Sequence, residues 1–121
     1  MSTLRLAFTG NHLITDVFYQ ETPAVLYDSD YPEIFLPLEV IDSCHWDTKE
    51  KVLTIALMEE IFIRTVTWGR KGSGEHLSLG IEVSLYLPFP EEREEEEISH
   101  LRKFLKSYHI PLYLSDREKR K

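Results

Sequence analysis

The sequence from Leu77 to Leu87 is LSLGIEVSLYL, in which every second residue is an aliphatic residue without exception. A period of two places alternate side chains on opposite faces of a β-strand. We therefore predict a strand over residues 77–87 with one buried, aliphatic face and one wetter face. This stretch indicates a fold whose core is built on a β-sheet.

A helix is predicted directly after this strand. Pro88 and Pro90 end the strand, and residues 91–97 supply six glutamates to the first turns. Acids early in a helix and bases late in it suit the helix dipole. An apolar stripe at spacings of three and four should lie across the sheet; it comprises Ile98, Leu101, Phe104, Leu105 and Tyr108. We expect the glutamate run to be a solvated face, or else an acidic patch for a basic partner or a cation.

Other runs with strand character precede residue 77. They are residues 4–8, 12–19, 24–27, 33–41, 52–57 and 61–68. Because Pro37 cannot donate to a ladder, residues 33–41 form either an edge strand or two short strands with a bend. Met58, Glu59 and Glu60 are expected to turn the chain between the next two runs. A last short strand is predicted over residues 112–114.

These elements define the predicted fold class. The connections are too short for crossover helices, so we predict an α+β fold: a predominantly antiparallel, strongly bent sheet or barrel of about seven strands, capped by one C-terminal helix near residues 90–108. This order of elements resembles the pleckstrin-homology (PH) superfold. PH domains commonly carry a tryptophan in the capping helix, where this chain has Phe104 and Leu105, and this chain lacks a basic first hairpin. The resemblance therefore implies a PH-like topology and not lipid-headgroup binding.

Length and composition limit the possible classes of protein. The chain has 121 residues, which suits a single domain over residues 1–115 followed by a charged tail over residues 116–121. Apolar residues make up 42% of the chain, and no apolar run is long enough to span a bilayer. Since Cys44 is the one cysteine, the sequence suggests a reducing compartment and a soluble, cytoplasmic protein. It also excludes a cysteine-based zinc site.

Charge is distributed unevenly along the chain. Residues 1–101 contain seven basic and 19 acidic residues, a net charge of −12, whereas residues 102–121 carry +5. An acidic body repels nucleic acid and anionic membranes, so neither is an expected partner of residues 1–101. The expected partner is another protein, one with a basic surface.

A surface for such a partner is predicted where aromatic and acidic residues gather. The candidate interface comprises Tyr27, Asp28, Asp30, Tyr31 and Trp46. We expect Trp46 to be exposed or half-exposed, because it stands among Asp42, His45 and Asp47, and Trp68 to be a core residue. Asp28 and Asp30, with Glu33 nearby, could instead form a turn or hold a divalent cation.

Catalytic patterns are sparse. The five histidines have no helical metal-binding spacing, and no cofactor is expected. Cys44 and His45 are neighbours, but in a strand their side chains would point to opposite faces, which disfavours a Cys/His nucleophile. The loop Gly69 to Gly74 precedes a strand and not a helix, so a hairpin tip is favoured over a phosphate cradle.

The leading hypothesis is therefore a small acidic domain that acts as a non-enzymatic protein–protein interaction module. One variant is an inhibitor or immunity-type protein that masks a basic surface. The alternative is a small-ligand binder or enzyme whose polar groups meet in the barrel mouth; the candidates are His12, Asp42, His45 and His76. A third hypothesis is a homo-oligomer joined through the edge formed by residues 33–41.

Overall fold

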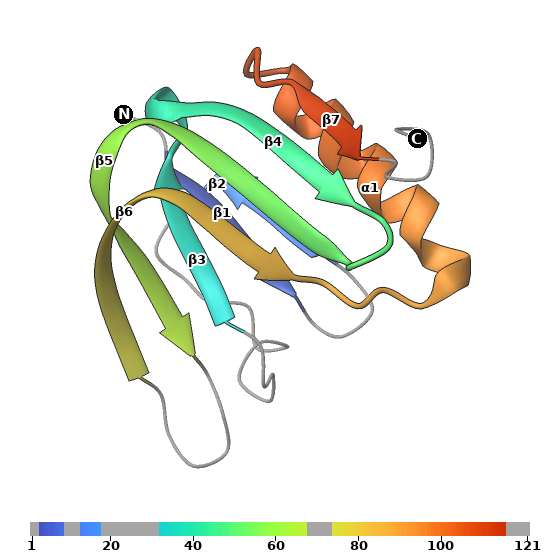
Figure 1. The fold of residues 1–121 in the computed structure, drawn as a ribbon, viewed down its shortest axis with the longest axis horizontal. Helices are drawn as coiled ribbons and strands as arrows, with labels where there is room; N and C mark the ends of the chain where they lie inside the picture. The colour runs from blue at the N-terminus through green and yellow to red at the C-terminus, as the bar shows by residue number, and fades with distance from the viewer. Residues whose placement is uncertain (1–2, 9–12, 18–31, 68–73, 116–121) are drawn as a thin grey trace.

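The computed structural model describes residues 3–8, 13–17, 32–67 and 74–115, and it is a strongly curled half-barrel sheet with one helix beside it (Figure 1). The strands in the described part are β1 (Thr3–Phe8), β2 (Leu13–Val17), β3 (Pro32–Pro37), β4 (Ile41–Asp47), β5 (Val52–Thr67), β6 (Gly74–Tyr86) and β7 (Leu112–Ser115). A 3₁₀ turn, η2 (Leu38–Val40), joins β3 to β4, and α1 (Glu91–Lys106) precedes β7. The predicted α+β class with a bent, mostly antiparallel sheet is confirmed.

β5 is the central strand of this sheet. β3 and β4 pair antiparallel with its two ends, along the same side, and β6 pairs with its other side. β1 lies on the far side of β3, and β2 lies beyond β1. β7 lies on the far side of β4 and forms the parallel pairing of the sheet.

The segment around Pro37 forms two strands with a bend. Pro37 ends β3, and η2 turns the chain into β4. The edge-strand interpretation of residues 33–41 is wrong, because β3 has β1 on one side and β5 on the other. The homo-oligomer predicted through that edge has no free strand there to use.

The predicted turn at Met58, Glu59 and Glu60 is also wrong, since β5 runs without a break from residue 52 to residue 67. Its pairing with β6 shifts between Ala56, which faces Glu82, and Ile61, which faces Gly80. Four residues of β5 thus lie opposite one residue of β6. Extra residues on one strand increase its bend and twist, so this irregularity accounts for the sharp curl of the β5–β6 hairpin at the left of Figure 1.

The helix prediction is confirmed, except that Tyr108 of the predicted stripe lies beyond the end of α1 and is 39% exposed. Pro90 is the N-cap of α1, and Ile98, Leu101 and Leu105 are buried against the sheet. After the helix, His109 adopts a positive φ of 62° as the chain turns into β7. The Arg102 guanidinium then donates to the Leu112 carbonyl at 2.7 Å and ties the helix to β7. No helix in the described part of the chain is long and apolar enough to cross a membrane.

One hydrophobic cluster joins the sheet and the helix. Its fully buried members include Leu4, Leu36, Cys44, Trp46, Leu53, Ile55, Leu101 and Leu105. They come from β1, β3, β4, β5 and α1, so helix and sheet share a single core.

Candidate functional site

The structure places one residue of the predicted interface in the core. Trp46 is only 2% exposed, so the prediction that it lies at the surface is wrong. It alternates with Cys44 along β4, and both point to the buried face. Its ring lies 5.7 Å from the Phe89 ring, between centroids, and its Nε1 donates to Glu94 Oε2 at 3.2 Å. The other predicted interface residues, Tyr27, Asp28, Asp30 and Tyr31, lie outside the described residues, as does Trp68.

Glu94 gathers several donors at the start of α1. In addition to Trp46, Thr48 Oγ1 and Lys51 Nζ from the β4–β5 turn donate to its carboxylate. Partial burial raises the pKa of Glu94, but hydrogen bonds from Lys51, Thr48 and Trp46 and the charge of Lys51 outweigh this effect and hold the pKa below its ordinary value. This carboxylate therefore anchors the helix to the sheet as an anion.

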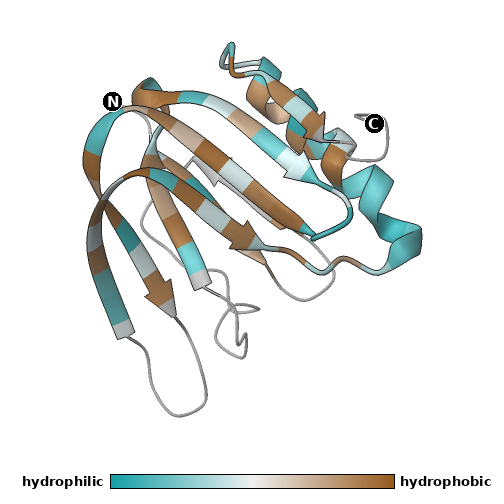
Figure 2. Cartoon of the chain, in the orientation of Figure 1, coloured by the Kyte–Doolittle hydropathy of each residue, from teal (hydrophilic) through white to brown (hydrophobic). Residues whose placement is uncertain are grey.

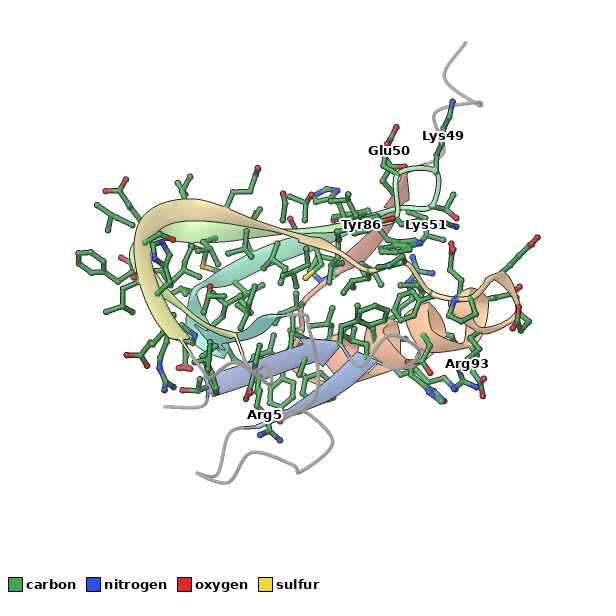
Figure 3. The ribbon with its side chains drawn as sticks, turned by 90° about the horizontal axis from the view of Figure 1, so that it is seen from below. Arg5, Lys49, Glu50, Lys51, Tyr86 and Arg93 are labelled. Atoms are coloured by element: carbon green, nitrogen blue, oxygen red, sulfur yellow. The ribbon has the colours of Figure 1, made fainter. Side chains whose placement is uncertain are left out.

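The neighbouring residues of the β4–β5 turn behave differently. Lys49 and Glu50 point away from the molecule (Figure 3) and are exposed. Lys51 adopts a positive φ of 60°, which turns the chain into β5. The turn thus directs one of its charged side chains to the helix and two to solvent.

Glu97 is the second glutamate that the helix directs inward. It is 7% exposed, and its carboxylate accepts the Leu13 backbone N–H at 2.8 Å and the Arg93 guanidinium at 3.1 Å. The prediction that the whole glutamate run is a solvated face is therefore wrong at residues 94 and 97. These two positions extend the stripe of Ile98, Leu101 and Leu105 toward the N-terminus of the helix.

Glu33 also has a structural partner. It is 1% exposed, and its carboxylate lies 3.6 Å from the guanidinium of Arg5 on β1. The pair is buried on the sheet face opposite the leucines of β1. Glu33 therefore neutralises Arg5 and does not join a surface group of carboxylates, and among the described residues no three metal-ligating side chains gather.

Cys44 and His45 do not form a catalytic pair. Cys44 is 1% exposed, and burial raises the pKa of its thiol to about 12, so it is protonated at neutral pH. His45 lies on the other face of β4, where its Nε2 is 3.3 Å from Ser43 Oγ and its ring centroid 5.2 Å from that of Tyr113. Among the described residues, the thiol has neither the charge nor the neighbouring base that a nucleophile needs.

A cavity of about 260 Å³ opens between β6 and the β1–β2 hairpin. It is lined by Leu6, Ala7, Phe8, Leu13, Ser84, Leu85, Tyr86 and Leu87. The polar groups expected in a barrel mouth do not line it: Asp42, His45 and His76 lie elsewhere, and His12 is outside the described residues. A mostly apolar lining with two hydroxyl-bearing side chains, Ser84 and Tyr86, and no carboxylate, imidazole or amine offers no set of groups for acid–base or nucleophilic chemistry.

The most unusual surface lies on the β5–β6 hairpin. Val83, Leu85 and Leu87 are buried as predicted, but Leu77, Leu79 and Ile81 are 57%, 54% and 57% exposed. The prediction of one continuous buried face is therefore wrong over the first half of the stretch. The register shift of β5 against β6 separates the two halves, so the alternation continues while the burial does not.

Pairing shows which exposed side chains lie together. Phe62, which is 68% exposed, is directly opposite Leu79, and Arg64 is opposite Leu77. Directly opposed residues share a face of the sheet, so Phe62, Leu77 and Leu79 form one apolar surface, which we name the arm face. Figure 2 shows the hydrophobic bands of this hairpin in brown.

The arm face is bordered by charge. The Arg64 guanidinium lies 4.5 Å from the centre of the Phe35 ring and pairs with Glu75. Glu59, Glu60 and Glu82 are exposed near the bend of the hairpin. The rim of the arm face thus contains one cation, Arg64, with its partner Glu75 and three further carboxylates, so its net charge is negative.

The exposed apolar area is large for a small protein. Ile81, two residues after Leu79 on β6, is 57% exposed, and Met58 near the bend of β5 is 64% exposed. With about 200 Å² for a large side chain, these two and the three arm-face residues expose about 600 Å² in total. Contiguous apolar patches of about 300–600 Å² are the largest on ordinary monomers and are often functional.

Comparison with known proteins gives no assignment, because no family model, curated protein or solved structure matches the chain. The PH-like topology therefore stays a prediction. The arm face was not anticipated from the sequence, since its residues were assigned to a buried strand.

Proposed function

We propose that this chain is a non-enzymatic protein–protein interaction module that binds its partner through the arm face. The observation that carries the proposal is the exposure of Phe62, Leu77 and Leu79 on one face of a paired hairpin. An aromatic residue that becomes buried at the centre of an interface is a typical anchor of binding. Phe62 is exposed in the free chain and can take this role when the partner covers it.

The rim indicates the chemistry of the partner. Glu59, Glu60 and Glu82 add negative charge beside the apolar centre, on a chain whose net charge is −7. Complementary charges at a rim steer association and select partners. We therefore propose a partner with an apolar pocket or ridge surrounded by basic residues, which includes the case of an inhibitor that masks a basic surface.

The competing ligand-binding hypothesis has less support. Its expected polar residues do not line the apolar cavity, and Cys44 is protonated and buried. The cytoplasmic location remains part of the proposal, together with the reducing compartment that the single buried thiol suits.

The test is capture of partners by the tagged chain from nuclease-treated lysate of the source cell, with washes at two salt concentrations. The variant is Phe62→Glu, and the matched control is Tyr113→Glu, an aromatic of 53% exposure on β7. We expect the wild type and Y113E to retain one stoichiometric partner at low salt and F62E to lose it, with binding at least about 30-fold weaker. Equal retention by F62E and Y113E, or a catalytic activity that survives F62E unchanged, would refute the proposal.

A further inference from the structure

β6 has an open edge. Within the described part of the chain it pairs only with β5, which leaves the backbone groups along its other side without a strand partner. The strand is 13 residues long and contains no proline, and no charged residue occurs from Leu77 to Ile81. Natural proteins usually protect long apolar edges with charges, prolines or covering segments, because such edges pair with other chains.

The sequence of β6 is complementary to itself when it is read in the opposite direction. About Leu79 as centre, Ser78 corresponds to Gly80 and Leu77 to Ile81. One step further out, His76 corresponds to Glu82. Small residues therefore meet small residues, aliphatic residues meet aliphatic residues, and a histidine meets a carboxylate, which are favourable cross-strand pairs in an antiparallel ladder.

We propose that β6 pairs antiparallel with β6 of a second copy of this chain, with the two Leu79 residues opposite each other on a two-fold axis. Such an interface uses the same patch on both subunits, as the commonest homodimers do. The pairing joins the two sheets into one and places the arm faces of the two copies side by side. It goes beyond the proposed function, because it uses the backbone edge of β6, whereas the proposed partner contacts the side chains around Phe62.

The area that the dimer would bury indicates how stable it is. Leu77, Leu79 and Ile81 are each a little over half exposed, so with the strand edge each copy would bury on the order of 400 Å². A stable interface of standard size buries about 800 Å² per partner. We therefore expect a dimer that forms reversibly as the protein concentration rises.

The salt dependence of binding distinguishes this dimer from the proposed complex with a different protein. Each copy carries a net charge of −7, so two copies repel each other at long range, and added salt screens this repulsion. The dimer should strengthen with salt. A complex with a basic partner should weaken with salt, which is the opposite response.

The experiment is analytical ultracentrifugation of the full chain over a range of concentrations, at low and high salt. Leu79→Lys and Leu79→Glu each place like charges opposite each other at the centre of the interface, and an equimolar mixture places Lys opposite Glu. Leu114→Lys on β7 is the matched control, because Leu114 is 55% exposed and Leu79 is 54% exposed. Thermal unfolding of all variants checks that each one folds.

We expect a concentration-dependent dimer for the wild type and L114K, monomers for L79K and L79E alone, and recovery of the dimer in their mixture. A wild type that stays monomeric at every concentration, L79K that dimerises like L114K, or a mixture that stays monomeric would overturn the proposal. The F62E variant tests the dimer hypothesis and the partner-binding hypothesis independently. If F62E dimerises but loses its partner, both stand, and if the wild type is monomeric yet captures a partner that F62E loses, only the dimer fails.

Discussion

Replacing Glu94 by alanine removes the acceptor that holds the start of α1 on the sheet. Three donors lose their partner: the Trp46 indole, the Thr48 hydroxyl and the Lys51 ammonium. Thr48 is exposed and can turn to water, and Lys51 is one-third exposed. Trp46 has no such freedom, because it is 2% exposed and its N–H points at the carboxylate.

These contacts set the size of the effect. A buried donor left without an acceptor costs about 1–3 kcal/mol, and a partly exposed ion pair contributes about 0.2–1 kcal/mol. We therefore expect Glu94→Ala to lower the free energy of unfolding by about 2–3 kcal/mol. For a chain of 121 residues the entropy of unfolding is about 0.25 kcal/mol/K, so the Tm should fall by about 8–12 °C.

The assay is thermal and denaturant unfolding at neutral pH, followed by tryptophan fluorescence and far-UV circular dichroism. Glu95→Ala is the matched control, since Glu95 is exposed in the same turn and the helix propensities change equally. It should stay within about 0.5 kcal/mol of the wild type. If E94A and E95A unfold together, close to the wild type, the reasoning on Trp46 and Glu94 is refuted.

The remaining predictions concern titration and thiol chemistry. Because the pKa of Glu94 is lowered in the folded state, its contribution to stability is fully present above the ordinary carboxyl pKa and is lost as pH falls through the lowered value. The stability difference between the wild type and Glu94→Gln, measured by urea unfolding from pH 7 to pH 3, should therefore shrink toward acid; a constant difference would contradict it. Cys44 should resist a thiol reagent such as Ellman's reagent at pH 8 in the folded chain and react once urea unfolds it, since the folded thiol is buried and its pKa is about 12. Fast labelling without denaturant would show that the thiol is accessible.

The sequence predicted the elements whose patterns are local. Helix α1 followed from Pro90, the early acids and the apolar stripe, and the strand period of residues 77–87 was correct. Glu94 and Glu97 were missed, although they stand four residues before Ile98 and Leu101 respectively, on the same helical face. Because they are charged, they were predicted to face solvent. Their hydrogen-bond donors, however, come from distant segments: Thr48 in the turn after β4 donates to Glu94, and the Leu13 N–H at the start of β2 donates to Glu97.

Burial depended on contacts that are not local. Trp46 was expected at the surface because its sequence neighbours are polar, yet it alternates with Cys44 on the covered face of β4. Leu77 and Leu79 were expected inside because they alternate, yet the register shift of β5 carries them beyond the core. A period identifies the face of a strand, whereas the neighbouring elements decide whether that face is covered.

The parallel pairing of β7 with β4 has a consequence for synthesis. The Cys44 amide donates to the Pro111 carbonyl at 2.9 Å, and Cys44 and Leu112 are partners in the ladder. β4 therefore cannot receive its second neighbour until residues 112–115 have left the ribosome. Contacts between such distant segments form slowly, and a strand that waits for its partner exposes an edge to other nascent chains. The last element described thus determines when the β4 edge of the sheet is covered.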